Sequence, residues 1–392
     1  MKQEAIERDN IAIQDALSGW WQQSMENRDE KMQWWREARF GMFLHWGVYT
    51  VAGAKWKDDE PAVYSEHLMR HSRIHKSDYV RELVQKFNPV DFDADRWVQY
   101  AQETGMKYIV VLAKHHDGLA LYPSKVNNYN ITLTKYQGDP IGELQQACRK
   151  RGIKFGLYYS QAWDWEDKNA PGNDWDYKNP GGNLNLYAAP GEFWHMTSPE
   201  LVEHIAREYV DKKSIPQIQE IMEWYHPDIL WFDTPSKLPL SENLRILKMV
   251  RQKYPEVIVN SRITHDEPRV MPYRNFADYL NTADRPAEVY PADGDWEAIP
   301  TTNESYGYSA YDTSFKEPSF FTRLLADTVA KGGNLLMNIG PMPNGVFHPT
   351  DVKILEGIEQ WMKKNSESIY GCGASGLPAQ VWGSITKKGR TL

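Results

Sequence analysis

The chain repeats one pattern along its length: a short apolar run that ends abruptly in polar or aromatic residues. Apolar runs of this length are typical of buried strands. Between several of them, apolar residues recur with helical spacing, as in residues 93–105, 142–152 and 215–227. Because strands and helices alternate, the pattern predicts a parallel sheet. The seven runs end at or near His45, His116, Ser160, Asp233, Arg262, Asp284 and Asn338.

Strands with polar residues at one end predict an α/β fold of the (β/α)8 or TIM-barrel type, whose chemistry gathers at the carboxyl-terminal face. A doubly wound sheet would alternate in the same way. Such a sheet usually carries a glycine-rich phosphate-binding loop after its first strand, and this sequence has none there. We therefore expect the barrel.

The same pattern divides the chain into three parts. Residues 1–36 are expected to form a helical N-terminal lead-in, and residues 37–372 a (β/α)8-like barrel that is the expected catalytic domain. Residues 373–392 predict a linker and the first strand of a β domain whose remainder is missing. The alternative for this last part is a short terminal strand that pairs back on the barrel.

Two stretches interrupt the barrel pattern, residues 53–80 and residues 164–200. We predict long loops there, and long loops in compact domains are commonly functional. Residues 349–368 predict an amphipathic helix that begins near Pro349.

Composition excludes some classes of partner. The net charge is −8 and no stripe of lysine and arginine is visible, so we expect no nucleic acid partner. No apolar run is long enough to cross a bilayer, and the first ten residues lack the apolar core of a signal peptide.

Cys148 and Cys372 have no metal spacing; a disulfide is possible, but Cys148 is better explained as a small buried residue of a helix.

The most informative run is ILWFDTP, which ends in Asp233. Aspartate is a poor strand former, so a reason other than propensity places it there. A carboxylate at the exit of a buried strand, beside Trp231, suits a nucleophile that acts on a sugar. The alternative is that Asp233 only caps the following helix.

A metal site is not expected, although His115 and His116 are adjacent. Neighbouring residues of an extended segment point to opposite faces, so both would not bind one ion. There is no HExxH helix and no other cluster of metal ligands. We also expect no cofactor.

Cleavage of a glycosidic bond fits these residues better, because it needs two carboxylates that flank one bond. Asp233 supplies the first, and the second is open among Asp284, Glu288, Glu297 and Glu66. Aromatic residues make up 13% of the chain, which suits the apolar faces of sugars, although large cores also use them.

At this point a family resemblance emerges. The segments RFGMFLHWGVYTVAGAKW, KYIVVLAKHHDGLALYPSK, KFGLYYS, YHPDILWFDTP, DWEAIPTTNESYGY and KGGNLLMNIGPMPNG occur in this order within residues 33 to 372. Together they resemble glycoside hydrolase family 29, the α-L-fucosidases. The resemblance implies a (β/α)8-like barrel, usually followed by a β-sandwich, and a retaining mechanism through a covalent glycosyl-enzyme.

The resemblance also implies roles for single residues. It makes Asp233 the nucleophile and Asp284 the acid/base candidate, with Glu288 as the runner-up. Aspartate departs from the glutamate often found at this position, so the acid/base assignment stays open. Residues implied or expected to contact the sugar are His45, Trp56, Glu66, His115, His116, Tyr159, Trp231, Arg262 and Glu297.

The function implied is an exo-acting, retaining α-L-fucosidase whose partner is a fucosylated oligosaccharide or glycoconjugate. Two alternatives remain: a relative that accepts another α-L-glycoside such as an α-L-galactoside, and a catalytically impaired fucose-binding protein. The resemblance implies a periplasmic or secreted location. The sequence does not indicate the oligomeric state.

Overall fold

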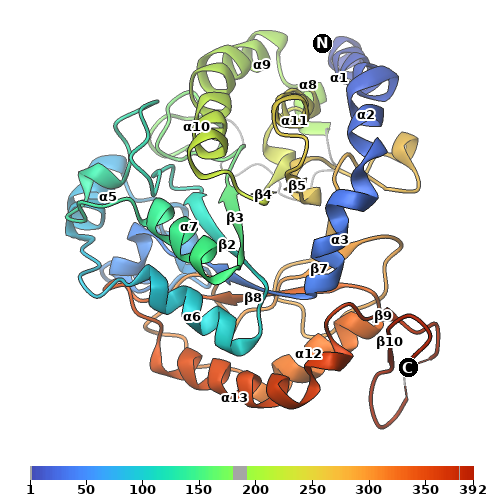
Figure 1. Cartoon of the computed structure of the whole chain (residues 1–392). Helices are drawn as coiled ribbons and strands as arrows, with labels where there is room; N and C mark the ends of the chain where they lie inside the picture. The colour runs from blue at the N-terminus through green and yellow to red at the C-terminus, as the bar shows by residue number, and fades with distance from the viewer. Residues whose placement is uncertain (1, 180–191, 379) are drawn as a thin grey trace.

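The computed structural model describes residues 2–179, 192–378 and 380–392. Its centre is a sheet of eight parallel strands with helices around it (Figure 1). In space the strands follow the order β5-β4-β3-β2-β1-β8-β7-β6. They are β1 Phe40–Leu44, β2 Tyr108–Lys114, β3 Lys154–Tyr159, β4 Ile229–Phe232, β5 Ile258–Val259, β6 Leu280–Asn281, β7 Trp296–Ala298 and β8 Asn334–Ile339.

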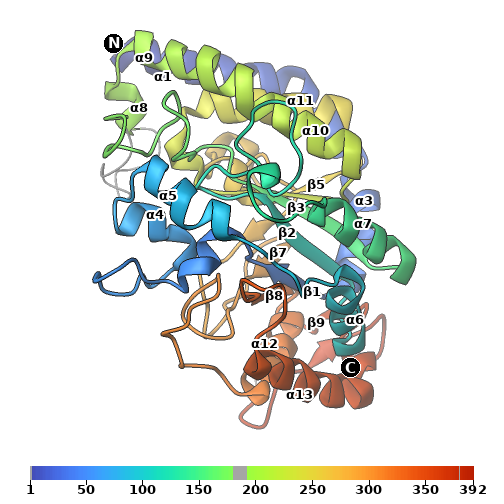
Figure 2. The same cartoon turned by 90° about the vertical axis from the view of Figure 1, so that its left-hand side faces the viewer.

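The helices cover the outside of this sheet (Figures 1 and 2). In chain order they are α1 Lys2–Asp15, α2 Trp21–Glu26, α3 Arg28–Ala38, α4 Leu68–His71, α5 Lys76–Glu82, α6 Ala94–Thr104, α7 Pro140–Arg151, α8 Glu192–Met196, α9 Pro199–Ile205, α10 Ile215–Tyr225, α11 Leu240–Lys253, α12 Pro318–Ala330 and α13 Pro349–Asn365. The three helices predicted between strands are confirmed as α6, α7 and α10, and the amphipathic helix predicted at Pro349 is confirmed as α13.

Local sequence signals set the ends of these helices. The carboxylate of Asp93 accepts a hydrogen bond from the backbone N–H of Arg96 and so caps the start of α6. Gly105 ends the same helix with φ of 91°, a conformation that favours glycine. Asp139 and Gly152 bound α7 in the same way.

The two edges of the sheet meet at β5 and β6, which closes the curled sheet and confirms the predicted barrel. Asn260 and Tyr279 form a parallel bridge across this edge. Next to it, the backbone N–H of Asp278 donates to the carbonyl of Val259 at 2.9 Å. Both strands are only two residues long, so few backbone bonds are available to hold the closure.

The side chain of Asp278 strengthens the closing edge. Its Oδ2 accepts a hydrogen bond from the backbone N–H of Val259 at 2.8 Å. It also forms ion pairs with Lys31 of α3 at 2.9 Å and with Arg251 of α11 at 2.8 Å. Burial alone would raise the pKa of Asp278, but Arg251 and Lys31 outweigh it and hold the pKa below its ordinary value. Helices α3 and α11 therefore help to fix the closing edge of the barrel.

The barrel differs from the prediction in its seventh strand, which was not expected. β7 has three residues and includes Glu297. The segment 53–80 is not one long loop as predicted, because it contains α4, α5 and a 3₁₀ turn at Ser65–His67. In the other predicted loop, 164–200, the described part contains α8 and the start of α9, while residues 180–191 lie outside the described residues.

The C-terminal residues form a small antiparallel pair, β9 Gly373–Ala374 with β10 Thr386–Lys387, which lies beside α12 (Figure 1). The domain limits at residues 36 and 372 and the further β domain stay predictions. Both cysteines are free and buried, and Cys148 lies in α7 as predicted. Among the described helices, none is both long and apolar enough to span a bilayer.

Aromatic side chains fill the barrel below its carboxyl-terminal end. Tyr158 stacks on Trp231 with ring centroids 5.5 Å apart, and Phe43 lies 5.1 Å from Trp231. Deeper, the ring of Tyr108 occupies the space where a Cβ atom on Gly41 would lie, at 2.5 Å, so this close approach needs glycine. The upper aromatic layer forms a floor for the cavity above it.

Candidate active site

A pocket lies above this floor, at the carboxyl-terminal ends of the strands. It is lined by Phe43, His45, Tyr64, Glu66, His67, His115, Tyr158, Trp231, Asp233, Arg262, Asp284, Ile299 and Tyr306. Ten of the thirteen side chains are histidines, tyrosines, carboxylates or an arginine, and the other three, Phe43, Trp231 and Ile299, are apolar; polar groups set among apolar ones are common in sites for small polar ligands.

Asp233 follows β4 directly, and three donors hold its carboxylate. Oδ2 accepts from the hydroxyl of Tyr158 at 3.0 Å. Oδ1 accepts from the backbone N–H of Thr234 at 2.9 Å and from Nη1 of Arg262 at 3.1 Å. Thr234 has φ of 50°, which is unfavourable for a β-branched residue. This strained turn directs the chain away from the strand, and such strain often accompanies functional residues.

Arg262 joins Asp233 to a second carboxylate. Its Nη2 donates to Oδ1 of Asp284 at 2.6 Å and to the carbonyl of Thr282 at 3.2 Å. The guanidinium lies over the ring of Trp231, 5.1 Å from its centroid. Burial would lower the pKa of Arg262, but Asp284 and Asp233 outweigh burial and hold it above the ordinary value. Arg262 is therefore a cation that bridges both carboxylates.

Asp233 and Asp284 differ in exposure. The side chain of Asp233 is 15% exposed, whereas that of Asp284 is 40% exposed. Asp233 thus lies inside the pocket and Asp284 at its mouth, where a group entering from solvent would pass. The two carboxylates have different environments although they share one guanidinium.

His45 offers a hydrogen-bond acceptor to the pocket. Its Nδ1 lies 2.6 Å from Oδ1 of Asn338, while Nδ2 of Asn338 donates to the carbonyl of Tyr306. The amide oxygen of Asn338 is therefore the acceptor, so Nδ1 of His45 carries the proton and Nε2 is left as an acceptor. Burial lowers the pKa of His45 to about 4, which keeps this ring neutral.

His115 and His116 lie together, which corrects the expectation that they point to opposite faces. Their ring centroids are 4.1 Å apart, because β2 ends at Lys114 and both histidines belong to the turn that follows. His115 stacks on Tyr158 at 5.2 Å and lines the pocket, and its buried Nδ1 has no hydrogen-bond partner among the described residues.

His116 does not line the pocket but stands behind Asp233. Its Nε2 lies 3.7 Å from Oδ2 of Asp233. Its Nδ1 is 2.6 Å from Oγ of Ser160, which donates to the carbonyl of Trp163. Ser160 must therefore accept from Nδ1 of His116. In the residues that the structure describes, no group of three or more His, Cys, Asp or Glu is arranged to hold a metal ion.

Glu66 lies on the 3₁₀ turn at the pocket wall. Its Oε2 accepts from the backbone N–H of Gly307 at 2.8 Å. Burial raises the pKa of Glu66 to about 7. Near neutral pH this carboxyl group is therefore divided between its protonated and ionised forms.

Besides His116, four more predicted residues are not brought to the pocket. Tyr159 points outward and donates to Oε1 of Gln217 at 2.9 Å. Trp56 is half-buried with the ammonium group of Lys57 over its ring. Glu288 is exposed and accepts only from the hydroxyl of Tyr290 among the described residues.

Glu297 is the fourth, and it lies deep inside the barrel. It accepts from Tyr108 at 2.8 Å, and from Trp231 and Asn281 at 3.3 Å. Burial raises the pKa of Glu297 to about 7. It supports the pocket floor through Trp231 instead of reaching the cavity.

Several pocket residues were missed from the sequence. Tyr158 occupies the position expected for Tyr159, since neighbouring strand residues face opposite sides. Tyr64, His67 and Tyr306 come from loops, where no periodic signal exists. The only available signals were the segment TTNESYGY and the histidine that follows Glu66.

A parallel barrel with two carboxylates, an arginine and histidines above an aromatic floor is typical of glycoside hydrolases. The α-L-fucosidase family model matches residues 10–367, so the chain belongs to the α-L-fucosidase family, which is glycoside hydrolase family 29. The chain is 28% identical over 357 residues to the tissue alpha-L-fucosidase of Rattus norvegicus, which covers 86% of this chain and 69% of the rat protein.

Solved structures agree with this assignment. The crystal structure of the alpha-L-fucosidase from Vibrio sp. strain EJY3 has a TM-score of 0.78 and 33% identity, over 92% of this chain and 59% of that chain. This chain therefore spans about three-fifths of the Vibrio protein. An alpha-L-fucosidase from Bacteroides thetaiotaomicron, solved as a trapped covalent intermediate, has a TM-score of 0.78 and 27% identity, over 93% of this chain and 81% of that chain.

The pKa values of the pocket histidines give a first prediction. Burial lowers the pKa of both His45 and His67 to about 4, against about 6.5 in an unfolded chain. We expect NMR titration midpoints near pH 4 for both rings, assigned with His45→Gln and His67→Gln. Because the unfolded chain takes up these protons first, the free energy of unfolding should fall as the pH drops from 6.5 toward 4. A midpoint above pH 6 for either ring would contradict its buried, neutral state.

Proposed function

We propose that the chain is an exo-acting, retaining α-L-fucosidase that removes terminal α-L-fucosyl groups from fucosylated oligosaccharides or glycoconjugates. The observation that carries this proposal is the bridge from Arg262 to both Asp233 and Asp284 in one pocket. Family membership and the names of the relatives support fucose as the sugar that is removed. The trapped covalent intermediate of the Bacteroides relative supports the retaining mechanism.

In the first proposed step, an oxygen of Asp233 attacks the anomeric carbon of fucose. The bond from that carbon to the glycosidic oxygen breaks, and its electron pair stays on the oxygen. Protonated Asp284 gives its proton to this oxygen, so the leaving group departs as an alcohol. Arg262 and Tyr158 hold Asp233 in place for the attack.

In the second step a water molecule attacks the same carbon. Asp284, now a carboxylate, takes the proton from this water, and the bond between fucose and Asp233 breaks. Fucose leaves with its original anomeric configuration because the carbon was inverted twice. The aromatic floor and the buried histidines limit solvent around the ester.

The assignment of Asp284 as acid must overcome its contact with Arg262. The guanidinium of Arg262 donates to Asp284 at 2.6 Å, so a bound leaving group has to draw Asp284 away from Arg262 before proton transfer. Glu66 is the alternative within the pocket, since its pKa of about 7 suits an acid. Glu288 is exposed and outside the pocket.

The lining favours fucose over an α-L-galactoside. These sugars differ at C6, where fucose has a methyl group and L-galactose a hydroxymethyl group. Phe43, Trp231 and Ile299 give the pocket an apolar share that suits a methyl group. Galactoside activity and impaired catalysis remain the alternatives, and a periplasmic or secreted location remains a prediction.

The nucleophile can be tested with an aryl α-L-fucoside, whose good leaving group needs little protonation. We expect Asp233→Ala to lose at least about a thousandfold in kcat, because the covalent step has no other attacking group. Glu288→Ala is the matched control, an exposed carboxylate that should keep wild-type turnover. If Asp233→Ala retains more than about a tenth of wild-type kcat with its fold intact by circular dichroism, Asp233 is not the nucleophile.

Azide separates the acid/base candidates. We expect Asp284→Ala to release aryl fucoside slowly and to be accelerated about tenfold or more by azide, which needs no general base. The product should be α-L-fucosyl azide, because azide replaces water in the second step.

The same assay on Glu66→Gln and Glu288→Ala provides the comparison. Acceleration of Glu66→Gln by azide, without acceleration of Asp284→Ala, would transfer the acid/base role to Glu66. A β-configured azide product from Asp284→Ala would contradict the proposed double displacement.

A further inference from the structure

The segment that carries Asp284 has few backbone anchors. Strand β6 ends at Asn281, and the backbone N–H of Thr282 still donates to the carbonyl of Glu297 at 3.0 Å. Beyond this point, residues 283–288 form no backbone–backbone hydrogen bond with any residue that the structure describes. The proposed acid/base therefore lies on a segment whose conformation must be set by contacts with side chains.

Arg285, the residue after Asp284, holds an unusual backbone conformation. Its φ is 52°, in the left-handed region that residues with a Cβ atom rarely adopt. Such a conformation persists only where surrounding contacts hold it. One of these contacts is Tyr306, whose hydroxyl accepts from the backbone N–H of Arg285 at 3.2 Å and donates to the carbonyl of Ile299 at 3.0 Å. A side chain of the pocket wall thus anchors the backbone next to Asp284.

The guanidinium of Arg285 provides a second anchor, at Glu304. Its Nη1 donates to the carbonyl of Glu304 at 2.6 Å and to Oε2 of the same residue at 3.1 Å. The side chain of Glu304 is 52% exposed, but Lys316 donates to its Oε1 at 3.1 Å. The backbone N–H of Glu304 donates to Asp312 at 2.7 Å. Arg285 therefore joins the segment after β6 to a well-held part of the segment after β7.

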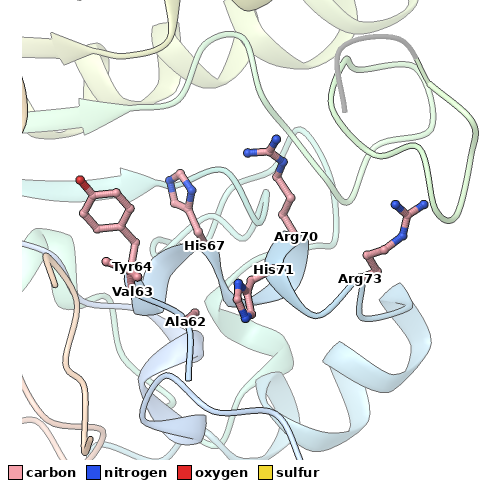
Figure 3. A pocket seen from close by; sticks show the side chains of 7 residues that line it. All are labelled: Ala62, Val63, Tyr64, His67, Arg70, His71 and Arg73. Carbon is pink, nitrogen blue, oxygen red and sulfur yellow. The ribbon is translucent and has the colours of Figure 1, made fainter. Parts of the chain in front are cut away.

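Tyr64 provides a third contact, from the segment after β1. The guanidinium of Arg285 lies over the ring of Tyr64, 4.6 Å from its centroid. Tyr64 lines both the pocket and a neighbouring cavity of about 380 Å³. Figure 3 shows Tyr64 and His67 projecting to the same side of their segment. One side chain, Arg285, thus ties together three segments at the mouth of the pocket.

The proposed mechanism needs such a fixed point. Asp284 is bonded to Arg262 at 2.6 Å, so its carboxyl group must turn from Arg262 to the glycosidic oxygen. A turn of the side chain reaches a defined position only if the backbone beside it stays in place. Misplacing a reacting group by about 1 Å can cost about a hundredfold in rate.

We propose that Arg285 is a positioning residue for the acid/base, which fixes the backbone beside Asp284 through Glu304 and Tyr64. This inference rests on the proposed fucosidase activity and on Asp284 as its acid. Arg285 does not exchange a proton with the substrate. The proton still passes from Asp284 to the glycosidic oxygen while the bond from that oxygen to the anomeric carbon breaks.

Two aryl α-L-fucosides with different leaving groups test the proposal. A 2,4-dinitrophenolate leaves with little protonation, whereas a phenolate needs a proton. We expect Arg285→Ala to lose about tenfold or more in kcat/KM on the phenyl fucoside and to stay within about twofold on the dinitrophenyl fucoside. The comparison uses kcat/KM because it covers the steps up to departure of the leaving group. Arg285→Lys should recover part of the loss, since it keeps the charge without the planar fork.

Two further variants complete the test. Glu304→Gln removes the carboxylate but keeps the backbone carbonyl that accepts from Arg285, so we expect a smaller loss, again confined to the phenyl fucoside. Arg274→Ala is the matched control. Arg274 also has a positive φ, of 66°, and an ion pair, with Asp266, but it precedes β6 instead of following it. It should leave the ratio of the two kcat/KM values unchanged.

The failure of this proposal can be told apart from that of the activity. If Asp284→Ala loses more on the phenyl than on the dinitrophenyl fucoside, but Arg285→Ala lowers both equally or neither, the positioning role is refuted and the fucosidase stands. If Asp284→Ala shows no such difference, the acid lies elsewhere, and the positioning role falls with that assignment. A wild-type chain that turns over neither fucoside would refute the activity itself.

Discussion

The short edge between β5 and β6 is the constraint on which the site depends. Arg262 follows β5 and Asp284 follows β6, so closing this edge brings the guanidinium to Asp284 and, from the neighbouring β4, to Asp233. The backbone offers little to hold strands of two residues. Buried Asp278 provides further contacts that hold this edge: its carboxylate accepts a hydrogen bond from Val259 and forms ion pairs with helices outside the sheet. Breaking a buried ion pair of this kind is costly, so the catalytic geometry depends on charges far from the pocket.

Charge inside the pocket is arranged by burial. The histidines are kept neutral, as the lowered pKa of His45 shows, so Arg262 is the cation that contacts both carboxylates. A neutral imidazole that accepts from a hydroxyl can bind a sugar without neutralising Asp233.

The sequence allowed much of this arrangement to be predicted, because strand ends in a parallel barrel must converge. That rule located Asp233, Arg262 and Asp284 correctly at one mouth. It could not assign faces: a strand buried on both sides has no polar alternation, so strand ends alone do not separate Tyr158 from Tyr159, and the family resemblance implied Tyr159. Strand β7 was not predicted because a strand of three residues gives no periodic signal. Its Glu297 faces the barrel interior, where it accepts a hydrogen bond from Tyr108.

Incubation with a 2-fluoro-fucosyl fluoride, followed by mass spectrometry of the intact chain and its peptides, tests the central claim most directly. Fluorine at C2 slows both steps, and a fluoride leaving group restores the first, so the glycosyl-enzyme accumulates. The account predicts a mass increase of one fluorinated fucosyl group per chain, located on Asp233 in the peptide that contains ILWFDTP. Turnover without any adduct, or an adduct on a residue other than Asp233, would contradict it.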